Sequence, residues 1–184
     1  NDSAVHEKVG VYPRGSFSGP HGLMLGEDID LRLFMNRWDS AYAALDGAHP
    51  SLHFFDRHGD AVHKVHLRDG SDRAEFDRLV EIFRAADQSP HQRVTPPAIA
   101  TPPRPDTEVD VAAFHAAWLA MQDTHEFFGL LRRHDVARTQ ALRLAPPGHS
   151  ERVVLDAPAL ALNAAAAAAL PIMVFVGSIG CIQI

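Results

Sequence analysis

One histidine in the second half of the sequence lies among large apolar side chains. Read at helical spacing, it shares a stripe with four such residues at steps of three and four: Phe114, Trp118, Met121 and Phe128. A polar ring on such a face, here His125, is costly to bury unless it has a partner. Spacing alone leaves two interpretations open: a core histidine bonded to a nearby carbonyl, which is the commoner case, or a ligand to a metal or cofactor.

Other histidine-based sites lack the partners that they need. A zinc motif of the H-E-x-x-H type requires a second histidine on the same helical face, and neither His6 nor His125 has one. His63 and His66 lie three apart in a predicted strand, so they point to opposite faces. The single cysteine, Cys181, excludes zinc sites built from several thiolates, and no phosphate-binding glycine loop or nucleophile elbow occurs. A histidine-ligated metalloenzyme stays open as an alternative.

Haem needs a different set of residues. It takes an axial nitrogen ligand, apolar and aromatic walls for the macrocycle, and arginines for the propionates. Phe127 and Phe128 follow His125 directly, and three arginines lie within about four helical turns: Arg132, Arg133 and Arg138. This pattern is compatible with a haem site, and equally with a solvated helix face.

The bulk composition limits the class of protein. The 184 residues, 46% of them hydrophobic, suffice for one domain or two small ones. A net charge of −6 without a run of basic residues argues against a nucleic-acid partner. One cysteine fits a reducing compartment, so we expect a cytoplasmic protein.

Residues 160–184 carry no charge and are long enough to cross a bilayer. Asn163 and Pro171 interrupt this run, and its composition changes from alanine to β-branched and aromatic residues. We therefore expect no membrane span, but a helix followed by a buried strand at Ile172–Val176.

The first part of the chain has the alternation of an antiparallel sheet. In 28–33, Ile29, Leu31 and Leu33 share one face. Ser51–Phe55 and Ala61–Arg68 flank a glycine-bearing turn and form a predicted hairpin. A helix is then expected from a cap at Asp72, with an apolar stripe of Phe76, Leu79, Val80 and Phe83.

The second part is predicted to be helical and to follow a proline-rich linker. Residues 88–109 hold six of the thirteen prolines, a composition typical of an extended, semi-rigid segment. Asp110 is the expected cap of the helix bearing Phe114, and Asp135 is expected to cap a helix bearing Arg138. Asp123 starts a second capping box, at which the helix can restart with His125 in its first turn. Because the chain opens without methionine and stops within a predicted strand, we expect a piece of a longer protein.

The sequence resembles the bacterial cytoplasmic haem-utilisation proteins called hemin-degrading factors or hemin transport proteins. The matching stretches occur in family order over nearly the whole chain: Ala4–Glu7, Asp30–Phe34, Asn36–Trp38, Phe54–Asp56, Gly59–Ala61, Lys64–Val65, the His125 helix and Ile172–Ile184. The resemblance implies two homologous halves, each with helices followed by an antiparallel sheet, of which this chain covers the central portion.

The resemblance also implies roles for individual residues. It makes His125 the axial ligand of the haem iron and Arg138 the residue facing the iron from the other side. Phe34 and Phe128 would cover or pack near the haem (iron protoporphyrin IX), and Arg32 would lie at its polar edge. In one departure, Ile179 stands where the family usually has arginine.

Together these observations predict an α+β protein: a sheet with a closing helix (1–87), a linker (88–109), and a helical segment with a first strand (110–184) that packs against the sheet. The expected function is cytoplasmic haem trafficking, haem degradation with iron release, or both. A downstream haem oxygenase and a second copy of the chain are the expected partners. The alternative is a non-catalytic fragment with His125 in its core.

Overall fold

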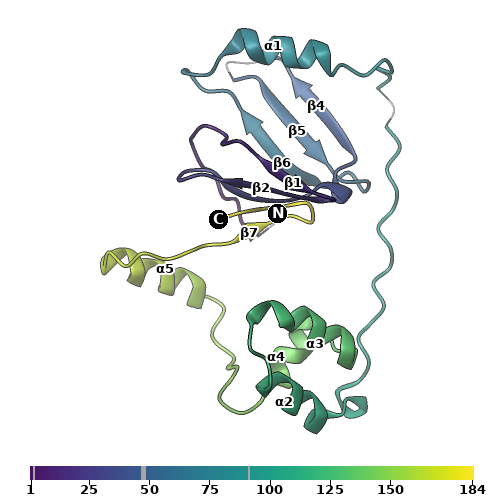
Figure 1. Cartoon of the computed structure of the whole chain (residues 1–184), viewed down its shortest axis with the longest axis vertical. Helices are drawn as coiled ribbons and strands as arrows, with labels where there is room; N and C mark the ends of the chain where they lie inside the picture. Colours follow the sequence, from purple (N-terminus) through teal and green to yellow (C-terminus); the bar gives the residue numbers. More distant parts are fainter. Residues whose placement is uncertain (2, 47–48, 91) are drawn as a thin grey trace. The chain divides into compact units, whose positions relative to one another are not determined.

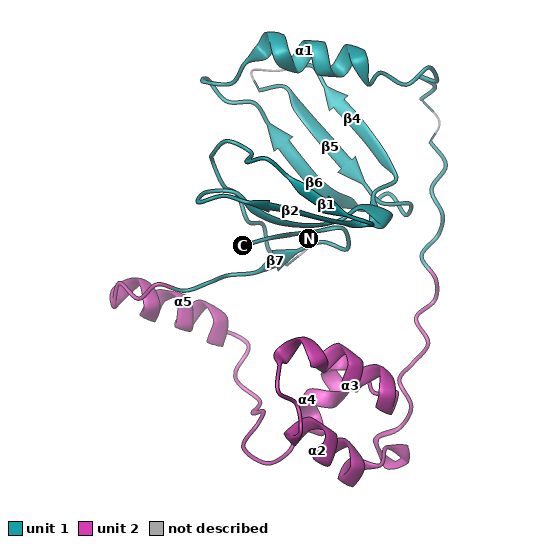
Figure 2. Ribbon diagram, in the orientation of Figure 1, with its two compact units in different colours: residues 1–97, 172–184 teal, residues 98–171 magenta. Residues whose placement is uncertain are grey.

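The computed structural model describes residues 1, 3–46, 49–90 and 92–184, which form two compact units (Figures 1 and 2). Unit 1 comprises Asn1–Pro97 and Ile172–Ile184, and unit 2 comprises Ala98–Pro171. The predicted α+β class is confirmed, since antiparallel strands fill unit 1 and a helical segment follows them in the chain. The division predicted from the sequence differs chiefly at the C-terminal end: it places Ile172–Ile184 with the helical segment, whereas the structure places these residues in unit 1. The expected packing of the helical segment on the sheet stays a prediction.

Unit 1 contains a five-stranded antiparallel sheet. Its order is β1 (Ser16–Ser18), β2 (His21–Leu25), β3 (Asp30–Phe34), β8 (Cys181–Gln183) and β7 (Val176–Gly177). The strand β3 therefore pairs on one side with its neighbour in sequence and on the other with the end of the chain. Such a distant partner carries no local signal in the sequence.

The core of unit 1 follows the alternation read from the sequence. Ile29, Leu31 and Leu33 have exposed fractions of only 5%, 1% and 5%. They form one buried cluster with Val62 and Cys181. The predicted buried face of this strand is thus confirmed, because successive side chains of a strand point to opposite faces.

A second, three-stranded sheet completes unit 1. It consists of β4 (Ser40–Ala44), β5 (Ser51–Phe55) and β6 (Ala61–His66), all antiparallel, with the short turn η1 (Met35–Arg37) before it. The buried carboxylate of Asp56 accepts hydrogen bonds from the amides of His58 and Asp60 and so closes the predicted hairpin. Gly59 in this turn has φ +84°, a conformation that favours glycine.

The helix α1 (Arg73–Ile82) follows the second sheet. It begins as predicted, because the Asp72 carboxylate accepts a hydrogen bond from the amide of Glu75. The predicted apolar stripe is only partly correct: Phe76 is buried, whereas Phe83 is 79% exposed.

The proline-rich segment forms no regular element over most of its length. From Arg84 to Pro105 the described residues form neither helix nor strand. The amide of Thr95 donates to the carbonyl of Arg57, and the ring of His58 bonds the carbonyl of Thr95, so this part of the segment lies along the hairpin turn of unit 1.

Unit 2 is built from short helices. After the turn η2 (Asp106–Glu108) come α2 (Val111–Leu119), η3 (Thr124–Glu126), α3 (Phe127–His134) and α4 (Arg138–Arg143). Asp110 caps α2 as predicted, accepting from the amide of Ala113 at 3.0 Å. The core consists of Val109, Phe114, Leu130, Val136 and Ala141.

Two predictions for unit 2 are wrong. The stripe from Phe114 to Phe128 is not continuous, because α2 ends at Leu119 and the chain turns before η3 begins. The predicted restart at Asp123 is confirmed, since its carboxylate accepts from the amide of His125 in η3. Asp135 does not cap α4: it has φ +50°, a left-handed conformation that ends α3, and its amide donates to the carbonyl of Arg132. Asp tolerates this conformation better than most residues. Ala137 directly precedes α4 instead.

The uncharged C-terminal segment has two parts. The alanine run forms the predicted helix, α5 (Ala157–Ala167). The predicted buried strand at Ile172–Val176 is wrong, because Ile172–Phe175 form no strand and are between 39% and 69% exposed. A strand forms only where a neighbour supplies hydrogen bonds, which here begins at Val176. None of the helices among the described residues has the length and apolar character that crossing a membrane would need.

Candidate functional site

The imidazole of His125 is exposed. It lies in η3, the turn that leads into α3, and 93% of its side-chain surface is accessible. Phe114, from the same predicted stripe, is fully buried instead. The hypothesis that His125 is a core histidine is therefore wrong. The chain turns between the two residues, so the periodicity that placed them on one face does not apply.

A carboxylate two residues earlier holds this ring. Oδ1 of Asp123 accepts a hydrogen bond from the backbone amide of His125 at 2.7 Å and contacts ring Nδ1 at 2.6 Å. These backbone and side-chain hydrogen bonds lower the pKa of Asp123 below its ordinary value. The carboxylate is therefore ionised at neutral pH and accepts at both contacts.

The Asp123 contact determines which ring nitrogen can bind a metal. A neutral imidazole has one protonated nitrogen and one lone pair, and a carboxylate at Nδ1 requires the proton to be there. Nε2 of His125 then carries the lone pair, and it makes no hydrogen bond to any residue that the structure describes. The arrangement presents one unprotonated nitrogen, held in orientation, at the surface of unit 2.

Two further predicted residues lie together in unit 2. The guanidinium of Arg138, at the start of α4, lies 5.5 Å from the ring centroid of Phe128 in the first turn of α3. Both residues are exposed, Phe128 by 54%. Unit 2 thus presents a nitrogen ligand, an aromatic ring and a cation from adjoining elements. These are the chemical types that haem requires.

The other two predicted residues belong to unit 1. Arg32 and Phe34 alternate with buried Leu31 and Leu33 on β3, so they share its opposite, half-buried face. Arg32 forms an ion pair with Asp30 on the same strand. The Phe34 ring packs edge-on against the ring of His21 on β2, with centroids 6.0 Å apart.

A second polar cluster, in unit 1, was not predicted from the sequence. The hydroxyl of Tyr12 lies 2.7 Å from Nε2 of His63, and Nδ1 of His63 lies 3.7 Å from Sγ of Cys181. Burial raises the pKa of Tyr12 to about 12 and that of Cys181 to about 11, and it lowers the pKa of His63. All three groups are therefore uncharged at pH 7. Nothing in local spacing predicts this contact, since it joins three distant segments.

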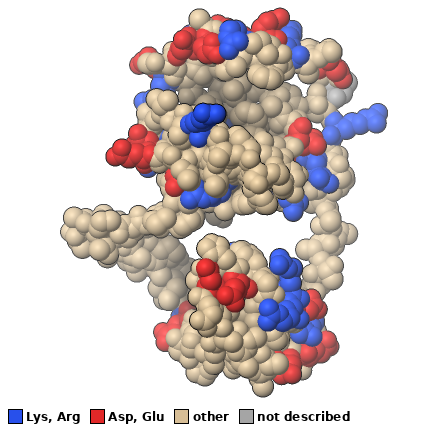
Figure 3. Space-filling view, viewed as in Figure 1, with Lys and Arg blue, Asp and Glu red and all other residues tan. Residues whose placement is uncertain are grey.

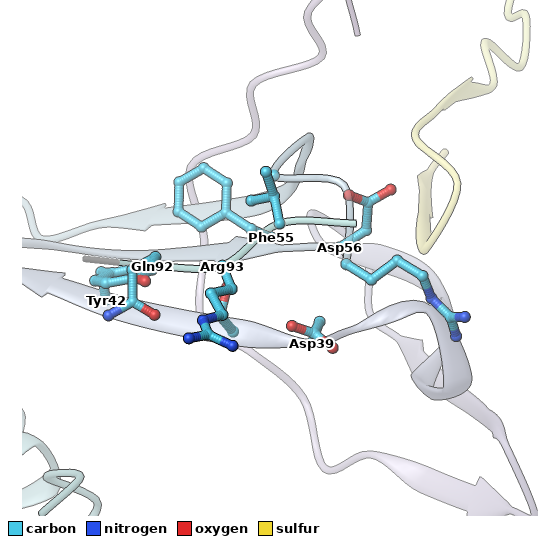
Figure 4. A pocket seen from close by; sticks show the side chains of 10 residues that line it. Asp39, Tyr42, Phe55, Asp56, Gln92 and Arg93 are labelled. Atoms are coloured by element: carbon cyan, nitrogen blue, oxygen red, sulfur yellow. The ribbon is translucent and has the colours of Figure 1, made fainter. Parts of the chain in front are cut away.

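A small pocket in unit 1 contains none of the predicted site residues. Its volume is about 200 Å³, and its lining includes Asp39, Tyr42, Phe55 and Arg93 (Figure 4). Typical small-molecule sites enclose about 300–1,000 Å³, so this pocket is too small for a macrocycle such as haem.

The charged side chains and the possible metal ligands can be surveyed in the same way. On the face drawn in Figure 3, both basic and acidic side chains occur on each unit. Within the part of the chain that the structure describes, no three His, Cys, Asp or Glu residues gather in a group that could hold a metal ion. The exposed His125 is thus not part of a cluster of three or more such ligands among the described residues.

Part of the chain matches a known family model. Residues 1–83 match the haemin-degrading HemS.ChuX domain. The chain is also 35% identical, over 189 residues, to the hemin transport protein HmuS of Yersinia pestis. That alignment covers all of this chain and 54% of HmuS, so the chain spans about half the length of the curated relatives that it matches.

Solved structures show the same relationship. The fold matches holo-PhuS, a heme-binding protein from Pseudomonas aeruginosa, with a TM-score of 0.86 and 41% identity over 92% of this chain and 51% of PhuS. It also matches ChuS, a heme degrading enzyme from Escherichia coli O157:H7, with a TM-score of 0.81 and 34% identity over 96% of this chain and 51% of ChuS. The resemblance read from the sequence is confirmed.

Proposed function

We propose that this protein binds haem for trafficking or breakdown, because residues 1–83 match the model of the haemin-degrading HemS.ChuX domain and the whole chain is similar to hemin transport proteins. The observation that carries the proposal is the exposed His125, whose ring is held by Asp123 with Nε2 directed to no other described residue. An exposed, oriented imidazole is what an axial iron ligand requires.

The residues of this chain fit the chemistry of haem. His125 would hold the haem iron through Nε2. Phe128 would contact the macrocycle, and Arg138 would supply a positive charge and hydrogen-bond donors near the iron. The proposal includes Arg32 at the polar edge and Phe34 as a covering aromatic, both taken from the family resemblance.

Delivery and breakdown of haem would both use His125 to hold the haem, so the proposal covers both functions. Haem, when bound, supplies the iron at which oxygen chemistry can occur. Arg138 would then stabilise negative charge next to that iron by charge-assisted hydrogen bonding, whereas simple carriage needs no such donor. For carriage, a downstream haem oxygenase in the cytoplasm is the proposed acceptor. A homodimer is the proposed assembly.

Hemin titration followed by absorption spectroscopy tests the proposal. We expect His125→Ala to weaken hemin binding at least tenfold, about 1.4 kcal/mol, and to abolish the spectrum of histidine-ligated haem. His149→Ala, an exposed histidine of the same unit, and His66→Ala in unit 1 are the matched controls and should change neither. Unchanged binding and spectrum in His125→Ala would reject the assignment.

The hemin-loaded protein from this titration can then be used to distinguish haem degradation from haem carriage. A reductant in air should bleach the haem absorption band and release iron if the protein degrades haem, and Arg138→Ala should then slow bleaching more than it weakens binding. Haem that stays intact and transfers to an acceptor protein instead identifies carriage.

A further inference from the structure

Asp123 makes an unusual double contact. A single oxygen, Oδ1, accepts from the backbone amide of His125 and from its ring Nδ1. From this geometry we infer that Asp123 is a positioning residue for haem: it fixes the tautomer and orientation of His125 and increases the electron donation of its ring to the iron. The inference rests on the proposed function, since it concerns the same ligand.

The tautomer follows from the partner of Nδ1. A carboxylate has only acceptor sites, so the hydrogen between the two groups belongs to the ring. This leaves the lone pair on Nε2, the nitrogen farther from the backbone. Without Asp123, nothing else within hydrogen-bond distance in the described structure would select this form, because Nδ1 of His125 has no second partner there.

The orientation of the ring follows from the second bond. An exposed side chain otherwise samples several rotamers, and ordering one on binding costs conformational entropy. Because one oxygen bonds both the backbone amide and the ring of His125, the ring is already restrained before haem arrives. Carboxylate partners of metal-binding histidines act in this way and also raise the basicity of the ligand.

Helix capping alone does not explain the contact. Asp110 and Asp72 cap α2 and α1 through amides three residues later, at 3.0 and 2.9 Å, and neither bonds a histidine ring. Asp123 instead bonds the amide two residues later and the ring of that same residue. Asp110 is therefore a matched control for the loss of a capping carboxylate in the same unit.

Two substitutions separate the charge from the hydrogen bond. In Asp123→Asn, the amide oxygen can still accept from the backbone and the ring, but it carries no charge. In Asp123→Ala, both contacts are lost. Asp110→Ala removes a cap while leaving His125 untouched.

The first measurement uses the haem-free chain. Nitrogen-15 NMR at pH 7.5 should find His125 protonated at Nδ1 in the parent, in Asp123→Asn and in Asp110→Ala. In Asp123→Ala it should find a mixture of tautomers. The same tautomer in the parent and in Asp123→Ala would overturn the inference. This result does not depend on haem, so it is distinguishable from a failure of the proposed function, which His125→Ala reports.

The second measurement uses the hemin-loaded chain. Asp123→Ala should weaken hemin binding about tenfold, the lower end of the range for such partners. Asp123→Asn should bind within about threefold of the parent, yet raise the reduction potential of the iron, because a neutral acceptor makes the ring a weaker donor. Asp110→Ala should change neither quantity. Equal potentials in the parent and Asp123→Asn would overturn the electronic part of the inference.

Discussion

At the scale of single residues, two histidines have opposite surroundings. His125 is exposed and held by a carboxylate, which suits it to bind a ligand from outside. His63 is packed against the rings of Trp38 and Phe54 and bonded to Tyr12 and Cys181. The surroundings therefore leave the ring of His125 open to a ligand, whereas the half-buried ring of His63 is enclosed by side chains of unit 1.

The burial of His63 predicts a dependence of stability on pH. Its pKa in the folded chain lies below the ordinary 6.5, so folding favours the neutral ring. The stabilisation is complete above pH 6.5 and is lost as pH falls toward the lower folded pKa. We expect the melting temperature of unit 1 to fall between pH 7.5 and 5.5, and to fall less in His63→Gln.

Fluorescence of Trp38 can follow this transition, because its ring lies 6.2 Å from that of His63. Trp118→Phe removes the other tryptophan, which lies in unit 2. The groups facing His63 are Tyr12, Trp38, Phe54 and Cys181, and the pKa values of Tyr12 and Cys181, about 12 and 11, exclude their titration in this range. His49→Gln, which replaces an exposed histidine of unit 1, is the control. An identical pH dependence in His63→Gln and the parent would contradict the prediction.

At the scale of elements, the turn between β7 and β8 connects the two sheets of unit 1. The carbonyl of Gly180 accepts from the amide of Phe34 and from Nε1 of Trp38, both at 2.9 Å. The hydroxyl of Ser178, in the same turn, donates to the carbonyl of Val62 on β6. The hairpin formed by β7 and β8 is therefore hydrogen-bonded both to β6 in one sheet and to the end of β3 in the other.

This close contact predicts the effect of adding one methyl group. A Cβ at Gly180 would lie 2.7 Å from Cγ1 of Val62 and 3.1 Å from Nε1 of Trp38. We expect Gly180→Ala to destabilise unit 1 by about 1–3 kcal/mol, the usual cost of overpacking. Urea unfolding followed by Trp38 fluorescence measures it.

Two further variants make the Gly180 prediction specific. Gly70→Ala, also in unit 1, adds a methyl group with nothing within 4 Å and should change the free energy of unfolding little. Val62→Ala should partly rescue Gly180→Ala by removing the clashing methyl group. Additive destabilisation in the double variant would show that the clash is not the cause.

At the scale of the whole molecule, the chain leaves unit 1, forms unit 2 and returns. Ile172–Ile184 contribute β7 and β8, and β8 pairs with β3 beside the buried core. Unit 1 is therefore discontinuous in sequence, while unit 2 is one continuous segment. Each unit has its own buried cluster, so each can unfold separately.

Truncation after Pro171 tests this organisation. Removing Ile172–Ile184 deletes the partner of β3, the buried Cys181 and the acceptor of Trp38. We expect unit 1 to lose at least about 3 kcal/mol, since each lost hydrogen bond alone contributes about 1 kcal/mol. Thermal unfolding should show a lower transition by Trp38 fluorescence, while Trp118 in unit 2 should report an unchanged one. If the Trp38 transition were unchanged, Ile172–Ile184 would not be a stabilising part of unit 1, contrary to the prediction.

The sequence by itself determined the features that depend on neighbours a few residues apart. Alternation predicted the buried face of β3, and side chains before helices identified Asp72 and Asp110 as caps. Alanine content predicted α5, and the family resemblance identified His125 as the candidate ligand. These are local effects, because helical and strand periods and capping bonds span at most a few residues.

Only the tertiary structure decided the exposure of His125, the environment of His63 and the place of the last strand. Apolar periodicity assumes one unbroken helix, and the turn after Leu119 removed His125 from the stripe. The contacts of His63 join residues 51 and 118 positions apart, and β8 meets β3 across more than 140 residues of sequence. Such contacts depend on how the whole chain closes its loops, and no window of a few residues contains both partners.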